Sequence, residues 1–251
     1  VALAHLWQSI GVQPSAIVGH SVGEIAAACV AGILSLKEGS RIIVLRARLM
    51  HECARGEGTM LAVGLSEEEA TALIARHDAS GSIAAFNGPR SLTLSGPRVS
   101  LEAIVAELEP KGVFARFVRV DHPFHHAMMQ PAADALTKEL AKLTPQAETV
   151  PFFSTVTGQR HAGKDCTAAH WGRGIRQSVQ FVSAVNAVAE FGVDVWLEIS
   201  SHPALSISIQ ECMGALSKKA QVTASTRRDR EHDSFLEAAL DLHRSGVELD
   251  F

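Results

Sequence analysis

The sequence predicts an α/β fold in two parts, and three observations support this prediction. Apolar runs of strand length alternate with amphipathic segments of helical period along most of the chain. A tight glycine turn at 19–23 joins the first predicted strand to a helix. Between 58 and 122 the order becomes strand, helix, strand, strand, helix, strand, which is that of a ferredoxin-like unit. We therefore expect a large domain with a parallel-sheet core, formed by 1–57 and 123–226, that is interrupted by this small unit.

The first part of the large domain is expected to contain three helices and one strand. Apolar residues at helical spacing predict a helix over 1–10, and a short apolar run predicts a buried strand at 16–18. An alanine-rich helix then ends at Ala31, before a glycine stop. A further helix runs from Ser35 to Met50, because Ser35 and the glutamate three residues later have capping-box spacing.

The inserted unit, 58–122, is expected to hold four strands and two helices. The strands are predicted at 60–65, 82–86, 91–95 and 113–120, and the helices at 66–77 and 99–109. Ser66 and Glu69 again have the spacing of a capping box. An Asn-Gly-Pro turn at 87–89 separates the two central strands.

After the inserted unit, helices and strands alternate again. The pattern predicts helices at 128–143 and near 179–191, and strands at 152–156 and 195–199. An Arg- and Asp-rich stretch at 227–233 is typical of a solvated linker, and a last helix ends near His243. The segment 227–251 is therefore treated as a C-terminal linker and helix.

The composition excludes several classes of protein. With 251 residues and 47% hydrophobic content, the chain is globular and not disordered. A net charge of -4, three Trp and no Tyr do not suit a nucleic-acid groove, which needs a basic field and stacking aromatics. No apolar stretch is long enough to span a membrane, and the first residues do not form a signal peptide. We therefore expect a cytoplasmic protein that binds a small molecule or another protein.

The cysteines show no metal-binding or redox pattern. They lie far apart and form no CxxC motif, so we expect no metal ligation and free thiols in a reducing cytosol. The four are Cys29, Cys53, Cys166 and Cys212.

Gly19-His20-Ser21-Val22-Gly23 forms a GxSxG motif between the predicted strand and helix. In this context the serine lies in a strained turn with its hydroxyl exposed, and both glycines relieve crowding. The Val22 amide, at the helix N-terminus, points to where an oxyanion would form. Ser21 is therefore the candidate nucleophile, and a chance GxSxG in a loop is the alternative.

Arg46 lies on the apolar stripe of the helix that follows the GxSxG segment. An inward guanidinium keeps its charge, and its planar fork suits a carboxylate, which belongs either to a structural Asp or Glu or to a substrate. The serine also needs a general base. His122 and His125 both follow the inserted unit, where the chain returns to the large domain, and the residues alone do not choose between them.

The segment GHSVGEIAAACVAGILSL at 19–36 resembles the nucleophile segment of malonyl-CoA:acyl-carrier-protein transacylases. It is more similar still to that of the acyltransferase domains of modular polyketide synthases. The similarity continues in order through NGP, HPFH, PFFSTVTG, WGRGIR and LEISSHPAL. The resemblance implies a hydrolase-like large domain and ping-pong acyl transfer without a permanently bound cofactor. Acyl-CoA is then the donor and the phosphopantetheine thiol of a carrier protein the acceptor.

The resemblance also implies roles for single residues. His125, the last residue of HPFH, corresponds to the base, and Arg46, 25 residues after the serine, to the holder of the malonyl carboxylate. Apart from the resemblance, we interpret His122 as a neutral, hydrogen-bonded wall residue of the substrate site and His20 as a residue that braces the turn beside that site. Phe124 stands where the family has Phe with malonyl and Ser with methylmalonyl, so a malonyl extender is implied. The implied partners are malonyl-CoA, an acyl carrier protein domain and the neighbouring ketosynthase domain of the same megasynthase.

Two other functions stay open. A serine hydrolase of the α/β-hydrolase type would run Ser, acid, His, with Asp194 or Glu198 as the acid and His202 as the base. A catalytically silent docking domain of a megasynthase would need none of these groups.

The chain also departs from the family pattern. Pro123 replaces the usual Ala, Asp121 stands where Ser or Tyr is frequent, and Gly174 stands where Asn is common. If that last position orients the base through its carbonyl, Gly174 can still do so. The family begins with a strand and a Gly-Gln-Gly loop that supplies a second oxyanion donor, and this segment precedes the region of similarity. Loss of one such donor costs roughly 100–1,000-fold in rate.

Overall fold

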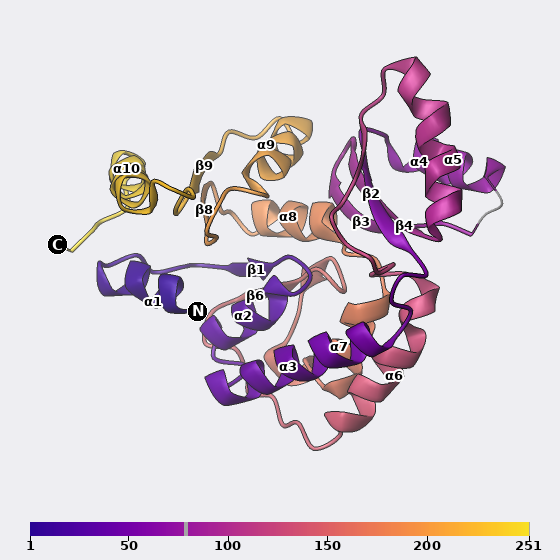
Figure 1. Cartoon of the computed structure of the whole chain (residues 1–251). Helices are drawn as coiled ribbons and strands as arrows, with labels where there is room; N and C mark the ends of the chain where they lie inside the picture. The colour runs from indigo at the N-terminus through magenta and orange to yellow at the C-terminus, as the bar shows by residue number, and fades with distance from the viewer. Residues whose placement is uncertain (78–79, 251) are drawn as a thin grey trace.

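The computed structural model describes residues 1–77 and 80–250 and has the mixed α/β content that the sequence predicts (Figure 1). Within these residues the strands form sheets of three, four and two strands. Asp78 and Ala79 of the inserted unit, and Phe251 of the C-terminal segment, lie outside the described residues. Every candidate site residue lies inside them.

The candidate nucleophile follows a strand of the three-stranded sheet. β1 (Ile17–Gly19) pairs in parallel with β6 (Phe152–Ser154), and β7 (Gln159–Arg160) pairs antiparallel with β6. Neighbouring residues of a strand face opposite sides of a sheet. Phe152 and Phe153 accordingly belong to two different hydrophobic clusters, so the sheet is buried on both faces.

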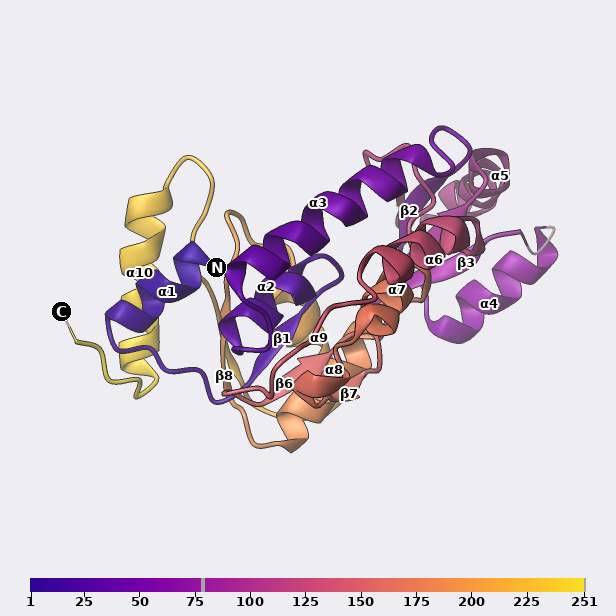
Figure 2. The ribbon, with the colours of Figure 1, turned by 90° about the horizontal axis from the view of Figure 1, so that it is seen from below.

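Helices cover both faces of this sheet (Figure 2). The cluster around Phe152 includes side chains of α2 (Gly23–Val30), α3 (Leu36–Glu52), α6 (Gln130–Glu139) and α7 (Ala168–Arg176), and the cluster around Phe153 includes side chains of α8 (Phe181–Glu190) and α9 (Ser206–Ala215). The predicted capping box at Ser35 is present, because its hydroxyl accepts from the Glu38 amide and its own amide donates to the Glu38 carboxylate. This box fixes the start of α3, the helix that carries Arg46.

The predicted parallel core is present as two separate pairs of strands. β8 (Val195–Glu198) and β9 (Gln221–Ala224) are parallel to each other and form a sheet of their own. Apolar runs indicate that a strand is buried but not which strand pairs with it, so the sequence could not separate the two pairs.

The inserted unit forms an antiparallel sheet in the order β3-β4-β2-β5. Its elements are β2 (Thr59–Val63), α4 (Glu67–Arg76), β3 (Ser82–Gly88), β4 (Ser91–Gly96), α5 (Arg98–Leu108) and β5 (Ala115–Phe117). This is the predicted element order, and the capping box at Ser66 is present. β5 is shorter than predicted, and the turn comes later than predicted because β3 extends to Gly88. A bridge between Ala85 and Val179 joins the unit to the large domain.

The α-helices and strands that lie outside the sequence prediction are β7, α7, α9 and β9. α7 contains Gly172 and Gly174, which weaken a helical pattern. Packing explains Gly172, because a Cβ there would lie 2.9 Å from the carbonyl oxygen of Ala133 on α6. The loss of α7 from the prediction matters, since this helix and the residue after it contact the candidate site.

The first and last helices lie side by side (Figures 1 and 2). α1 (Ala2–Ser9) packs on α10 (Glu231–Arg244), with the ring centroids of Trp7 and Phe235 4.2 Å apart.

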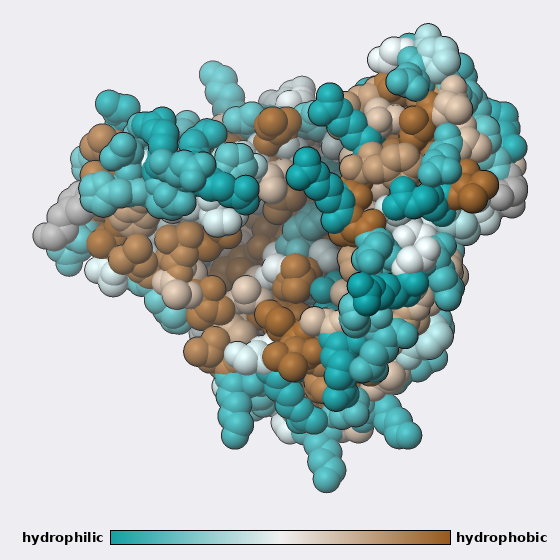
Figure 3. Space-filling model, in the orientation of Figure 1, coloured by the Kyte–Doolittle hydropathy of each residue, from teal (hydrophilic) through white to brown (hydrophobic). Residues whose placement is uncertain are grey.

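Hydrophobic side chains gather around a hollow in the face that Figure 3 shows. None of the described helices combines the length and apolar character needed to cross a bilayer.

Candidate active site

The GxSxG turn is strained at the serine. Ser21 lies between β1 and α2 with φ of +50°, in the left-handed region that non-glycine residues rarely adopt. Gly19 is required by close approach, since a Cβ there would lie 2.6 Å from the Glu24 amide nitrogen. Gly23 is not, because a Cβ there would meet nothing within 4 Å. The prediction that both glycines relieve crowding is therefore correct for Gly19 and wrong for Gly23.

The backbone after the serine leaves a donor free. The amides of Gly23 and Glu24 close turns back to the carbonyls of His20 and Ser21. Within the described residues the Val22 amide has no acceptor. This amide stands immediately before α2, where the helix dipole also favours negative charge, so it is available to an oxyanion formed on a substrate at Ser21.

Of the two candidate bases, His125 is the one that contacts Ser21. Ser21 Oγ lies 2.8 Å from His125 Nε2, and His125 Nδ1 lies 2.8 Å from the carbonyl oxygen of Gln177. A carbonyl can only accept, so Nδ1 carries the proton and the neutral ring presents a lone pair at Nε2. The Ser21 hydroxyl thus donates to a nitrogen that can take its proton.

Burial and charge keep this imidazole neutral. The His125 side chain is only 6% exposed. Burial first, and then the positive charge of Arg46, lower the pKa of His125 to about 4, although the hydrogen bond to Gln177 opposes them. Its own amide donates to the carbonyl of Ile175 on α7, 3.1 Å away. At neutral pH the His125 ring is therefore neutral.

Arg46 places its guanidinium beside the nucleophile. Its Nη2 lies 3.4 Å from Ser21 Oγ, and both residues line one pocket with His125. Among the described residues Arg46 forms no ion pair with a carboxylate, so the structural ion pair that the sequence left open is contradicted. Burial lowers the pKa of Arg46 to about 10, which leaves it cationic at neutral pH. An unpaired cation in this position can bind an anionic group of a substrate.

His20 connects the turn to the inserted unit. Its Nε2 lies 2.7 Å from Asn87 Oδ1 on β3, and Asn87 donates in turn to Thr93 on β4. Burial, above all, lowers the pKa of His20. This contact braces the turn, as predicted for His20. The sequence placed Asn87 in a turn, because an Asn-Gly-Pro sequence is typical of turns and did not indicate that β3 continues to Gly88.

His122 and Phe124 lie next to the base without lining the pocket that contains Ser21. His122 is buried, and its Nδ1 lies 2.7 Å from Asp121 Oδ1. Its ring stacks on that of Phe124 with centroids 5.3 Å apart. Phe124 also packs against the hydrophobic cluster of α2 and α3. Contact of either residue with a substrate stays a prediction.

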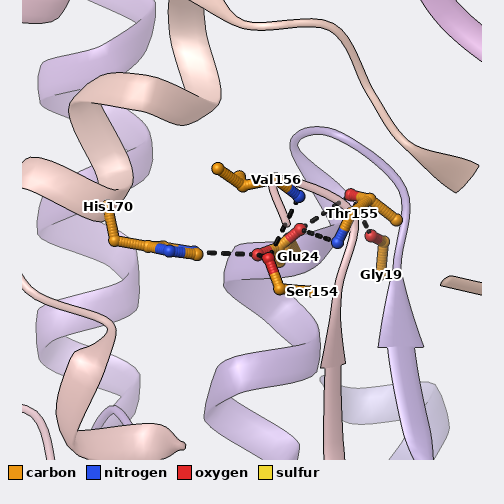
Figure 4. Close-up of polar contacts among 6 residues, drawn as sticks. All are labelled: Gly19, Glu24, Ser154, Thr155, Val156 and His170. Atoms are coloured by element: carbon orange, nitrogen blue, oxygen red, sulfur yellow. Dashed lines mark hydrogen bonds and ion pairs between the residues drawn. The ribbon is translucent and has the colours of Figure 1, made fainter. Parts of the chain in front are cut away.

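Glu24 anchors a buried network behind the nucleophile (Figure 4). Its carboxylate accepts from Ser154 Oγ at 2.6 Å, the Thr155 amide at 2.8 Å and His170 Nε2 at 2.9 Å. Burial raises the pKa of Glu24, but the hydrogen bond and charge of His170, followed by the two hydroxyls, hold it below its usual value. The Thr155 hydroxyl lies 2.7 Å from Glu24 and 2.9 Å from the Gly19 carbonyl. The network therefore ties β6 and α7 to the turn that carries the serine.

Among the described residues, Ser21, Glu198 and His202 do not form the triad of a hydrolase. Glu198 accepts from the amides of Ala204 and Ser206, both at 2.8 Å, and so caps α9. His202 is exposed, and the imidazole that contacts Ser21 is that of His125.

The group behind the base is a further correction to the sequence analysis. The acceptor of His125 Nδ1 is the carbonyl of Gln177, not that of Gly174. A backbone acceptor carries no side-chain signal, so the residue types could not reveal it. Glu24 was visible in the motif, but its partners come from β6 and α7, which are distant in sequence.

Comparison with known proteins points to one family. The family model described as acyl transferase domain matches residues 1–249. The chain is 41% identical over 253 residues to polyketide synthase GfsB of Streptomyces halstedii. This alignment covers 100% of this chain and 4% of that protein. It is similar to the acyltransferase domain from module 8 of the salinomycin polyketide synthase (TM-score 0.94, 34% identity, 99% of this chain and 59% of that chain). It is also similar to the malonyl CoA-acyl carrier protein transacylase from Clostridium perfringens (TM-score 0.87, 25% identity, 98% and 77% of the two chains).

Proposed function

The chain belongs to the acyl transferase domain family, and from that premise we propose that it moves an extender acyl group from acyl-CoA to the phosphopantetheine thiol of an acyl carrier protein during polyketide synthesis. The observation that carries the proposal is the contact of Ser21 with the neutral base His125, beside the unpaired cation Arg46. A nucleophile with its base suits transfer through a covalent ester, and the cation suits an extender with a free carboxylate.

In the first half-reaction Ser21 takes the acyl group. The proton of its hydroxyl moves to His125 Nε2 as Oγ attacks the thioester carbonyl. The Val22 amide donates to the resulting oxyanion. When the carbon–sulfur bond breaks, the CoA sulfur leaves with the proton held by His125, and Ser21 remains as an ester.

In the second half-reaction the carrier protein accepts the acyl group. Its phosphopantetheine thiol gives a proton to His125 and attacks the ester carbonyl of Ser21. The carbon–oxygen bond to Oγ then breaks, and His125 returns the proton to the serine. The enzyme ends in its starting state, as ping-pong transfer requires.

We propose malonyl as the extender unit. Arg46 holds the free carboxylate through two parallel hydrogen bonds, which its planar fork favours. The choice of malonyl over methylmalonyl rests on Phe124, the residue before the base, whose type accompanies malonyl in the resembling family. Phe124 lies outside the pocket lining that contains Ser21, so its effect on the extender requires a direct test.

The same premise supports an assignment of architecture and partners. We assign 1–57 and 123–226 to a hydrolase-like domain and 58–122 to a ferredoxin-like insertion, supported by the order β3-β4-β2-β5 with two helices. We assign 227–251 to a C-terminal linker and helix. The partners are a carrier protein domain and a ketosynthase domain of the same megasynthase, in line with the polyketide synthases to which the chain is similar.

Transfer to a carrier protein tests the proposal. The protein is incubated with malonyl-CoA and a phosphopantetheinylated acyl carrier protein, and the carrier is weighed by mass spectrometry. We expect malonyl-carrier with the unmodified chain and none above background with Ser21→Ala. Free malonate without malonyl-carrier would instead indicate a hydrolase, and equal transfer by Ser21→Ala would place the nucleophile elsewhere.

A further inference from the structure

Three potential metal ligands converge beside Glu24, away from the reacting atoms. His161 follows β7, Cys166 follows the short helix η3 (Gly163–Asp165), and His170 lies on α7. The ligand atoms of the three side chains lie within 4.8 Å of one another. Cys166 and His170 are each 0% exposed, while His161 is partly exposed. One short segment thus brings two imidazoles and a thiol together inside the protein.

Each imidazole of this group carries a nitrogen without a partner. His170 Nε2 donates to the Glu24 carboxylate, so Nδ1 is the nitrogen of that ring that is open to a ligand. Among the described residues neither His170 Nδ1 nor His161 Nε2 has a hydrogen-bond partner. Buried polar atoms are normally satisfied, and a positively charged ligand would satisfy both of these nitrogens.

The surroundings also suit a cation. The negatively charged carboxylate of Glu24 lies 2.9 Å from His170 Nε2. A carboxylate that accepts from the second nitrogen of a ligating histidine is the usual way in which such a histidine is oriented, and Glu24 does this for His170. A Cys166 thiolate and the Glu24 carboxylate together would offset the two charges of a divalent ion.

We propose that His161, Cys166 and His170 bind a zinc ion, with a water molecule as the fourth ligand. Thiolate and imidazole are the ligands that zinc prefers, whereas magnesium and calcium prefer oxygen. Tetrahedral zinc needs ligand atoms about 3.3–3.8 Å apart, so the group must contract by about 1 Å from its present limit of 4.8 Å. The side chain of the partly exposed His161, directly after the two-residue strand β7, is the ligand that would move.

The ion takes no part in acyl transfer. It holds the segment from β7 to α7 together and fixes the ring of His170 against Glu24. Glu24 lies three residues after Ser21, and Thr155 links its carboxylate to the Gly19 carbonyl. The zinc ion would therefore stabilise the network behind the nucleophile, and its loss would be seen in metal content and thermal stability rather than in the chemistry at Ser21.

Metal content and cobalt spectroscopy test this site. The purified chain is stripped with a chelator, exposed to zinc, freed of excess ion by gel filtration, and analysed by mass spectrometry for metals. We expect about one zinc per chain and a higher melting temperature with zinc than without. With cobalt we expect the absorption of a thiolate-to-metal charge transfer and the intense visible bands of a tetrahedral ion.

Matched variants decide whether binding occurs at these residues. Cys166→Ala should abolish the charge-transfer band, and its affinity for zinc should be at least tenfold lower. Cys212→Ala, which removes another buried cysteine that is 1% exposed and is not part of this group, should keep both. His161→Gln, at the partly exposed ligand, should also weaken binding and guards against a folding defect of the Cys166 variant. Ser21→Ala should bind zinc normally, so this test is independent of the proposed acyl transfer. No retained zinc, or equal binding by the chain and by Cys166→Ala and His161→Gln, would overturn the proposal.

Discussion

His125 and His170 are both buried, and they contact residues three positions apart, Ser21 in the turn before α2 and Glu24 in its first turn, but their partners differ. His125 contacts the Ser21 hydroxyl and a backbone carbonyl, which are both uncharged. His170 donates to the Glu24 carboxylate and has no partner at its other nitrogen within the described residues. One ring therefore presents a basic nitrogen to a hydroxyl, while the other is fixed by a negative charge.

The chemical role of each buried imidazole depends on the group that accepts a hydrogen bond from its N–H. A carbonyl orients the ring without adding a full negative charge, so burial keeps the pKa of His125 at about 4 and leaves its Nε2 free to take a proton from Ser21. A carboxylate orients the ring and also favours positive charge near it. We call Ser21, Arg46 and His125 the catalytic cluster, after the roles proposed for them. Glu24, Ser154, Thr155 and His170 are the support cluster.

The largest expected effect separates the two histidines. His125→Ala removes the base and should lower the rate of Ser21 acylation roughly 10²–10⁴-fold, with little change in thermal stability. His170→Ala deprives the buried Glu24 of a donor, so it should lower the free energy of unfolding by about 1–3 kcal/mol and slow acylation far less. Single-turnover acylation and chemical denaturation measure the two quantities. Similar rate losses in both variants would remove the distinction between the clusters.

The next effect tests how tightly the two clusters are joined. A Cβ on Gly19 would meet the backbone of Glu24, so Gly19→Ala must displace the serine turn from the support cluster. We expect a loss of roughly 100-fold in acylation rate and a lower melting temperature. Gly23→Ala is the control, since its Cβ has open space, and it should change neither. A Gly19→Ala variant with unchanged rate and melting temperature would show that the close approach is not needed.

Arg46→Lys tests whether the cation of the catalytic cluster reads the substrate. Lysine keeps the charge but loses the planar fork. We expect kcat/KM for malonyl-CoA to fall roughly 10–100-fold, because charge-assisted hydrogen bonds are lost. The kcat/KM for acetyl-CoA, which has no carboxylate, should stay unchanged or increase. An equal fall with both substrates would mark Arg46 as structural.

Phe124→Ser tests the extender proposal and should have a smaller effect. A competition between equimolar malonyl-CoA and methylmalonyl-CoA measures the preference of the unmodified chain and of the variant. We expect the unmodified chain to prefer malonyl and the variant to lose about tenfold of that preference, since one methyl group in an apolar pocket is worth about 1–3 kcal/mol. Parity in the unmodified chain would contradict the role of Phe124.

The smallest expected effect is a shift in pH dependence. His125 cannot act as a base once it is protonated, so acylation should fall as the pH drops through about 4. Arg46→Met removes a positive charge that lowers this pKa, so the fall should move to higher pH, by up to about one unit. Acetyl-CoA is the substrate for this measurement, because it does not need the cation. An unmoved acid limb would show that burial alone sets the pKa of His125.

The sequence predicts the catalytic cluster better than the support cluster, for physical reasons. Ser21 lies in a local motif with its own strand, turn and helix, and Arg46 stands out as a charge on an apolar stripe. Periodicity likewise predicts α3 and the order of the inserted unit, since both depend on local pattern. The residue types left the base open between His122 and His125, and only the resemblance chose between them.

What the sequence leaves out depends on contacts between distant segments. α7 is hidden by its glycines, yet it supplies His170, and the carbonyl behind His125 belongs to Gln177 directly after it. The separation of β1 and β8 into two sheets depends on pairing, which apolar runs do not encode. The absence of a CxxC motif predicts no metal site, although the spacing H-x4-C-x3-H at 161–170 places two imidazoles and a thiol within one segment.

The most direct test of the central claim is the identity of the acylated residue. The chain is incubated with malonyl-CoA, quenched in acid, and digested, and the peptides are sequenced by mass spectrometry. The account predicts one malonyl group, carried by Ser21, with labelling lost in Ser21→Ala and strongly slowed in His125→Ala. A malonyl group on another residue, or labelling that persists in Ser21→Ala, would contradict it.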